Sequence, residues 1–349
     1  MRFALLFLFA LACFAAPKRV LYITYTAGYR HASIPTSQQA LLDIASRSDG
    51  QLEVVPSEDL SLISADNLKS FDAVFFFTSG ELPITDQQKA DLLQFVRDGK
   101  GFGGAHSATD TFYTWPDYGD LIGAYFDGHP WVQQVGIDIE DPDHPAMRAL
   151  APSFQIFDEI YQVRNFSRDR VRVLMTLDTR SVDMNAPGIN RADGDFALAW
   201  CRSYGAGRVF YTALGHFDDT WLDPRFQTML SNALLWMTNQ VGGDATPRSS
   251  TPLIANGGIG DALVPGRALA PGSIISIYGT ALTTGSIMQG NAVKLAGTQV
   301  TLDGAPVPLL YVSPSQINAQ IPIDVPGGAT SMLQVWVPGV GSNTVAIRH

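Results

Sequence analysis

Three histidines and one glutamate follow stretches of sequence that predict buried β-strands. They are His31, Glu81, His106 and His216. In an open α/β sheet the carboxyl ends of the parallel strands meet at one edge, and ligands bind outside that edge. Imidazole changes its charge near neutral pH and a carboxylate can exchange protons beside it, so this set suits general acid–base catalysis. The sequence predicts a catalytic site at the strand ends, with His106 and His216 as the central pair and Glu81 as a helper. For Glu81, compensation of a helix dipole is the alternative.

His106 ends the glycine-rich stretch Gly-Phe-Gly-Gly-Ala-His-Ser-Ala-Thr-Asp, residues 101–110. The glycines predict a short buried strand against which helices pack closely, followed by a sharp turn. Such a turn lifts one side chain over the sheet in the nucleophile-elbow folds, and here that side chain is the imidazole. Ser107, Tyr113 and Trp115, in the polar loop that follows, are candidate substrate contacts.

A second candidate group lies further along the chain. Glu159 and Tyr161, in the stretch Asp-Glu-Ile-Tyr, offer an acid or base and a phenol that can bind sugar hydroxyls. Trp131 offers an aromatic face of the kind that suits a sugar ring. His129 lies in a loop, as does His144, for which a structural role is preferred. For Glu159 and Tyr161 the alternative is an outward-facing polar position on a strand. For the aromatic candidates, Tyr113, Trp115 and Trp131, the alternative is that they simply cover the core.

A divalent metal ion is the alternative to pure acid–base chemistry. Three of the histidines, or two and a carboxylate, could bind one and leave a position open for substrate. The chain contains no compact ligand motif such as His-Glu-x-x-His. No residue is therefore assigned as a metal ligand, and the cofactor stays open.

The elements that must position these residues alternate in type over the first part of the chain. A helix with a capping box begins at Thr85, and an earlier one runs to about Ser46. The expected strands are 19–26, 52–55, 71–77 and 101–105. Alternation of this kind predicts βαβ units in a parallel, doubly wound α/β sheet. Strands then dominate, at 132–139, 154–163, 171–177, 196–202 and 208–214, before a last helix at 223–240.

The C-terminal part has a different character. Residues 241–252 have the composition of a linker, and residues 253–349 contain few charges, many glycines and prolines, and short alternating runs. This pattern predicts a small all-β domain, an Ig-like sandwich. The catalytic candidates all lie in the domain that precedes it, residues 17–240.

The net charge and the N-terminal sequence indicate which partners and which location to expect for the protein. The 349 residues carry a formal charge of −10, and no run of Lys and Arg offers a surface for nucleic acid. Residues 1–16 have the basic start, short apolar core and small residues of a signal peptide, with cleavage expected near Ala15. Acylation of Cys13, as in a lipoprotein, matches the pattern only loosely. We expect an exported protein without a transmembrane segment after cleavage, with Cys201 as a buried thiol.

Residues 18–240 resemble the ThuA-like family, named for trehalose utilisation and related in fold to the class I glutamine amidotransferases. The resemblance rests on five motifs in order: Tyr29–Pro35, Gly99–Asp110, Tyr125–Trp131, Asp158–Tyr161 and Gly207–His216. It implies a flavodoxin-like sheet and a role in disaccharide metabolism. Arg30, His31 and His129, which lie within these motifs, are candidate substrate contacts. The amidotransferases carry a cysteine where this chain has His106, so glutamine hydrolysis is not expected.

Residues 254–349 resemble a β-rich module attached to many secreted bacterial proteins. The matching stretches are Leu269–Thr280 and Pro308–Asn318. Attachment to a cell surface or contact with a glycan is the role that this resemblance suggests.

These observations favour an exported enzyme that acts on a disaccharide, a glycoside or a keto derivative through its histidines. The alternatives are a non-catalytic sugar-binding protein and a metal-dependent hydrolase with histidine ligands. A small-molecule carbohydrate is the expected partner in each case.

Overall fold

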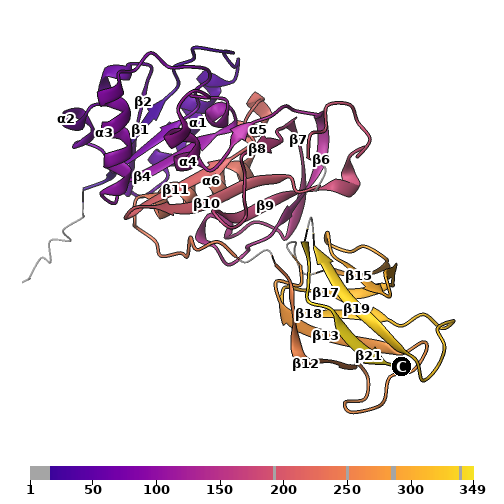
Figure 1. Cartoon of the computed structure of the whole chain (residues 1–349). Helices are drawn as coiled ribbons and strands as arrows, with labels where there is room; N and C mark the ends of the chain where they lie inside the picture. The colour runs from indigo at the N-terminus through magenta and orange to yellow at the C-terminus, as the bar shows by residue number, and fades with distance from the viewer. Residues whose placement is uncertain (1–15, 192–193, 249–250, 284–287, 338–339) are drawn as a thin grey trace, which may run out of the picture.

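In a computed structural model, the chain forms an α/β part and an all-β part (Figure 1), and each has its own hydrophobic core. The structure describes residues 16–191, 194–248, 251–283, 288–337 and 340–349. One core is formed by residues between Val20 and Ala245, and the other by residues between Ile254 and Ile347. Most of the predicted signal peptide, including Cys13 and Ala15, lies outside the described residues.

A nine-stranded sheet organises the first core, in the order β2-β1-β3-β4-β11-β10-β9-β6-β7. Its strands are β1 (Lys18–Ile23), β2 (Leu52–Ser57), β3 (Ala73–Phe76), β4 (Gly101–Ala105), β6 (Trp131–Ile139), β7 (Ser153–Ile160), β9 (Arg172–Asp178), β10 (Ala197–Tyr204) and β11 (Gly207–Thr212). The first five strands of this order are parallel and the remaining pairs are antiparallel. All residues of β3 and β4 are buried, as their apolar and glycine-rich sequences require in a sheet covered on both faces.

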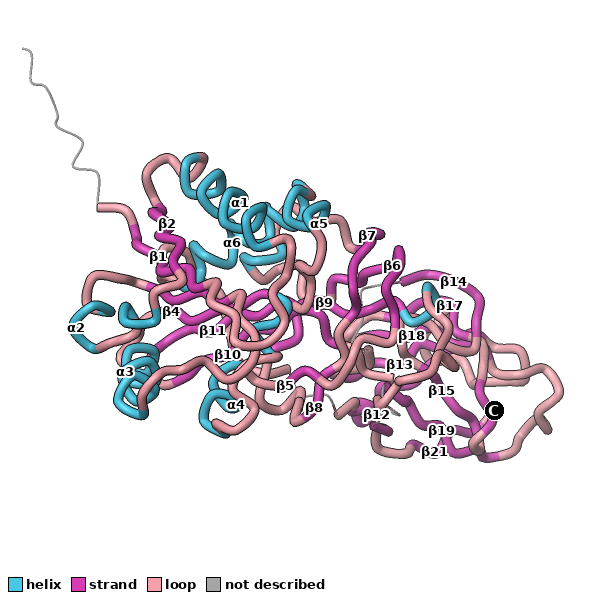
Figure 2. The backbone as a smooth tube through the Cα atoms, turned by 90° about the horizontal axis from the view of Figure 1, so that it is seen from above, coloured by secondary structure: helices cyan, strands magenta, loops and turns pink. Residues whose placement is uncertain are grey.

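Helices cover both faces of this sheet, which confirms the doubly wound α/β fold (Figure 2). One side carries α1 (Ile34–Ser46), α5 (Asp218–Leu222) and α6 (Pro224–Met237), which contact one another. The other carries α3 (Asp86–Arg97) and α4 (Pro116–Ile122), with the short α2 (Ala65–Leu68) against α3. The predicted capping box is present, because the Thr85 hydroxyl accepts from the Gln88 amide and the Gln88 side chain accepts from the Thr85 amide.

Several predicted elements differ from the structure in their bounds by one to three residues, and two of these differences have a visible cause. The last helix starts one residue later, because Asp223 caps it through the Arg225 amide, and it ends at Met237. The strand expected at 154–163 breaks after Ile160. The chain there leaves the sheet and forms β8 (Val163–Arg164), which pairs with β5 (Tyr125–Phe126).

The hairpin of β6 and β7 extends beyond its neighbour in the sheet. Gly136–Ile139 of β6 pair with β9, whereas Trp131–Val135 pair only with β7. The end of β7 reaches the loop after β11, although three strands separate β7 from β11 in the sheet order. The contact is direct, since the Gly215 amide donates to Asp158 Oδ2 at 2.7 Å.

The second core lies between two antiparallel sheets, which confirms the all-β character of the C-terminal part. Their orders are β12-β13-β18-β17-β14 and β16-β15-β19-β20, with β21 paired to β19. The strands are β12 (Leu253–Asp261), β13 (Ile274–Thr280), β14 (Met288–Ala292), β15 (Gln299–Leu302), β16 (Ala305–Pro306), β17 (Leu309–Val312), β18 (Gln316–Gln320), β19 (Thr330–Val337), β20 (Val340–Gly341) and β21 (Val345–Arg348). Four 3-10 turns complete the described elements: η1 (Leu60–Leu62), η2 (His106–Thr109), η3 (Pro145–Met147) and η4 (Thr179–Ser181). Among the described residues, no helix is both long and apolar enough to span a membrane.

Candidate functional site

His106 occupies a strained turn directly after β4. Its φ is +47°, a left-handed conformation that costs a residue with a side chain about 1–2 kcal/mol. The turn is possible because small residues, Gly104 and Ala108, lie on both sides of it. A Cβ on Gly104 would lie only 2.4 Å from the Cβ of Ala108. His106 Nδ1 lies 2.8 Å from the Ala213 carbonyl, which can only accept, so this nitrogen carries the proton. The Nε2 lone pair therefore points away from that carbonyl, toward His216.

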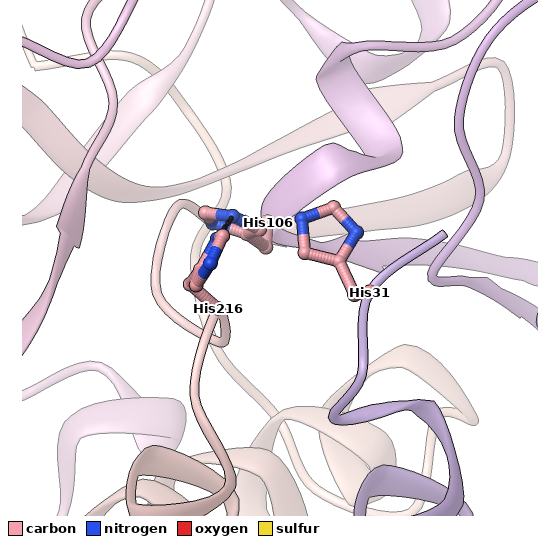
Figure 3. A group of neighbouring side chains, drawn as sticks. All are labelled: His31, His106 and His216. Carbon is pink, nitrogen blue, oxygen red and sulfur yellow. Dashed lines mark hydrogen bonds between the residues drawn. The ribbon is translucent and has the colours of Figure 1, made fainter. Parts of the chain in front are cut away.

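His31 and His216 converge on this ring from the loops that follow β1 and β11 (Figure 3). His106 Nε2 lies 3.1 Å from His216 Nδ1, and one nitrogen from each of the three rings lies within 4.8 Å of the others. The ring of His31 stands edge-on to the other two, with centroid distances of 4.9 and 5.0 Å. The two loops are tied together, because the Ser33 hydroxyl donates to the His216 carbonyl at 2.8 Å.

A carboxylate from β7 completes the group. Glu159 lies 3.7 Å from His106 Nε2, 3.4 Å from His216 Nδ1 and 3.8 Å from His129 Nδ1. Asp158, its neighbour, is fully buried and accepts from the amides of Gly215 and His216 at 2.7 and 3.1 Å. Asp158 thus fixes the loop that carries one histidine, while Glu159 faces the histidines themselves.

Burial controls the protonation of the site. Desolvation by burial and, to a smaller extent, the neighbouring His216 lower the pKa of His31 to about 4. Desolvation also lowers the pKa of His106 well below its ordinary value. At neutral pH both rings are therefore neutral, with one lone pair each. Burial raises the pKa of Asp158 to about 6, so its carboxyl is mainly ionised at pH 7.

Several other predicted residues also lie at the site. Tyr161 packs its ring on His106 at a centroid distance of 3.9 Å, and burial raises its pKa, so the phenol stays protonated. Ser107 is buried beside His106, and its hydroxyl has no hydrogen-bond partner in the described structure. His129, about half exposed, borders the same carboxylate, Glu159.

The remaining candidates make their contacts elsewhere. Glu81 binds the amide and hydroxyl of Thr114, both at 3.0 Å. Arg30 forms a surface ion pair with Glu58 at 2.6 Å.

The aromatic candidates are likewise engaged away from the histidines. Trp115 is buried against Phe112 and Tyr118. The indole of Trp131 donates to the Asp183 carbonyl and packs on Phe196. The Tyr113 hydroxyl donates to Asp110 at 2.5 Å.

Sequence reasoning missed the contribution of Tyr29. This side chain is 62% exposed and packs edge-on to His31, with a centroid distance of 4.8 Å, and nearly parallel to His216 at 6.3 Å. Its position directly before Arg30 and His31 was the only available signal. The anchoring role of Asp158 was missed too, because nothing local links it to the Gly215 amide.

Cys201 and His144 form a separate buried pair. Cys201 Sγ lies 3.5 Å from His144 Nε2, and burial raises the pKa of the thiol. Burial also lowers the pKa of His144 to about 4. The thiol stays protonated at neutral pH and inaccessible, as a structural cysteine does.

The chain resembles known proteins of one family. The family model described as ThuA, trehalose utilisation, matches residues 19–237. A ThuA-like protein from Bacteroides uniformis is 23% identical, with a TM-score of 0.54 over 65% of this chain and 95% of its own. A second, from Parabacteroides merdae, is 19% identical, with a TM-score of 0.51 over 64% of this chain and 91% of its own. No curated protein matches the chain. The fold agrees with both structures, and the family match covers most of the sequence: the chain belongs to the ThuA family.

Proposed function

We propose that this protein is an enzyme of carbohydrate metabolism that acts on a disaccharide, a glycoside or a keto derivative of one, by acid–base chemistry at His106, His216 and Glu159. One observation carries the proposal: His216 Nδ1 stands between His106 Nε2, at 3.1 Å, and Glu159, at 3.4 Å. The trehalose-utilisation description of the family supports the choice of a sugar as substrate. The site has no thiol, so covalent chemistry through an elbow cysteine plays no part among the described residues.

The hydrogen bonds give each group a role. Because His106 Nδ1 donates to the Ala213 carbonyl, His106 Nε2 can only accept, and it accepts a hydrogen bond from the Nδ1–H of His216. That arrangement leaves His216 Nε2 with a lone pair, which can take a proton from a sugar hydroxyl. The imidazolium that forms is stabilised by Glu159 at 3.4 Å, as a buried carboxylate stabilises the base of a catalytic triad. His106 acts as a positioning residue, and His216 as general base and then general acid.

The solvent-facing side of the site suits a sugar ring. His216 and Glu159 have partly exposed side chains (18% and 11%), so they can reach a ligand, while His106 is fully buried. Tyr29 offers an exposed aromatic face next to His216. Aromatic faces pack on the C–H-rich faces of sugars, and carboxylates and imidazoles bind the hydroxyls.

The test is an NMR time course of the protein with a panel of disaccharides and their 3-keto derivatives. Wild type, His106→Ala and Glu159→Gln are compared with Glu53→Gln, a matched control at an exposed carboxylate that pairs with Arg19 on the surface. We expect product from wild type and the control, and a loss of rate by about 10²–10⁴ in the two site variants. Saturable sugar binding without product would make the protein a sugar-binding protein instead.

We also propose that the chain is exported and that its C-terminal module contacts a glycan or cell surface. The basic start and short apolar core of residues 1–16 support export. N-terminal sequencing of the protein from the periplasm or medium should begin near Ala16. A chain that keeps Met1, or one with a lipid on Cys13, would contradict cleavage at that point. Binding of the isolated wild-type protein to cell-wall glycans tests the second part.

A further inference from the structure

We propose that His31, His106 and His216 bind one divalent transition-metal ion, with zinc as the representative case. This inference deepens the proposed function, because it assigns a cofactor to the same site, and it rests on that function only for the role of the ion in sugar chemistry. The three rings offer nitrogens within 4.8 Å of one another, and they lie on the segments that follow β1, β4 and β11 (Figure 3).

The distances fit a tetrahedral ion after a small movement. Zn–N bonds of about 2.0–2.1 Å place the nitrogens of a tetrahedral site about 3.4 Å apart. His106 Nε2 and His216 Nδ1 are 3.1 Å apart, and all separations in the group lie within 4.8 Å. Drawing the group to tetrahedral spacing therefore needs a movement of at most about 1.4 Å between any two of the nitrogens.

The surroundings of His106 are those of a metal ligand. Ligating histidines donate their second ring nitrogen to a carbonyl or carboxylate, which fixes the tautomer. His106 Nδ1 does so to Ala213 at 2.8 Å, so its Nε2 lone pair faces the other two rings. His216 frees the lone pair of its Nδ1 by moving the proton to Nε2, without any change in charge.

His31 supplies the independent observation. Its ring is 3% exposed, its Nδ1 is buried without a partner, and no hydrogen bond to the ring occurs among the described residues. A buried polar group left unpaired costs about 1–3 kcal/mol, so such a group calls for an explanation such as a bound ion. His31 points at two further imidazoles, and Glu159, at 3.4 and 3.7 Å from them, supplies negative charge beside an ion.

With the ion in place, His216 would be a ligand instead of the general base, and Glu159 would carry the proton at the same site. The protein lends itself to a direct test, because two of its other histidines give matched controls. His129 is about half exposed at the rim, and His144 is buried away from the site.

The experiment is calorimetric titration of the chelator-treated, full-length protein with Zn²⁺, repeated with Co²⁺ to record its visible spectrum. Wild type, His31→Ala, His106→Ala and His216→Ala are compared with His129→Ala and His144→Asn, and circular dichroism of each metal-free variant establishes its fold. We expect one ion per wild-type chain, a cobalt spectrum of low coordination number, and at least a 100-fold weaker affinity in each of the three ligand variants, with both controls near wild type. If a ligand variant fails to fold, loss of the Zn²⁺-dependent rise in melting temperature in the other two upholds the assignment.

Wild type that binds neither ion, or binding that survives all three substitutions, overturns the metal site. Turnover of a sugar by wild type that binds neither ion overturns the metal site and upholds the proposed acid–base function. Binding of one ion at these histidines without turnover of any sugar upholds the metal site and overturns the proposed sugar-converting function.

Discussion

Gly104 and Ala108 should behave as one packing unit under the turn that carries His106. A Cβ added at Gly104 would meet the Ala108 Cβ at 2.4 Å, against about 4 Å for an ordinary contact, and its next neighbour is the Phe76 carbonyl oxygen at 3.3 Å. Neither the Ala108 methyl nor the backbone can rotate away. Gly104→Ala should therefore cost about 2 kcal/mol, because overpacking costs about 1–3 kcal/mol and the loss of glycine flexibility returns less than 1.

Ala108→Gly alone should cost about 1–2 kcal/mol, from one buried methyl group and the added freedom of the unfolded chain. In the double variant the overlap at 2.4 Å is gone and only the 3.3 Å approach to Phe76 remains. We therefore expect the double variant to be about 2 kcal/mol more stable than the sum of the single effects.

Urea unfolding of the four proteins, followed by tryptophan fluorescence, measures this coupling. Additive effects within about 0.5 kcal/mol would refute the reasoning, because they would mean that the two positions do not share one space. A Gly104→Ala variant as stable as wild type would show that the turn yields easily, and that it does not hold His106 rigidly.

Three further predictions concern charge. His144, whose pKa burial lowers from 6.5 to about 4, stabilises the fold only while neutral, so stability is lost as the pH falls from 6.5 toward 4. Between pH 7 and 5 wild type should lose about 2 kcal/mol more than His144→Asn in urea unfolding, and equal losses would contradict this. Arg168 donates to both oxygens of Glu140, at 2.8 Å each, and to Asp195, so Arg168→Met should cost at least about 3 kcal/mol, whereas a cost below 1 would show that the carboxylates find other partners. Glu159→Gln should leave circular dichroism and the melting temperature close to wild type, and a large drop in either would make this residue structural.

The local patterns of the sequence were sufficient for most of the sheet. The continuous apolar residues of β3 and the glycines of β4 predict strands that are buried on both faces, and all residues of both strands are buried. The convergence of His31, His106 and His216 could also be predicted, because parallel strands place their following loops at one edge.

Glu81 shows the limit of that rule. It follows β3 as the histidines follow their strands, yet its carboxylate binds Thr114. A strand-end position brings a side chain to the edge of the sheet, but the neighbouring loop decides where it points. Nothing near Glu81 in the sequence indicates that Thr114 offers it both an amide and a hydroxyl.

Glu159 shows a second limit, which concerns register. It reaches the histidines because the β6–β7 hairpin extends past β9, and its end contacts the loop after β11. The length of that extension depends on which residues of β6 pair with β9, and such pairing between distant segments leaves no local signal. Tyr161 lies one residue beyond the end of β7, and the same extension of the hairpin places its ring on His106.

The central claim is that the histidine group beside Glu159 is where a sugar binds and reacts. The chain has six histidines, so imidazole NMR of protein labelled with ¹³C in histidine gives a small set of signals that can be assigned by substitution. On titration with a 3-keto disaccharide, the signals of His31, His106 and His216 should shift together and saturably, while those of His144 and His349 stay fixed. Shifts confined to His144 or His349, or none at any of the three in the presence of a sugar that the protein converts, would contradict the account.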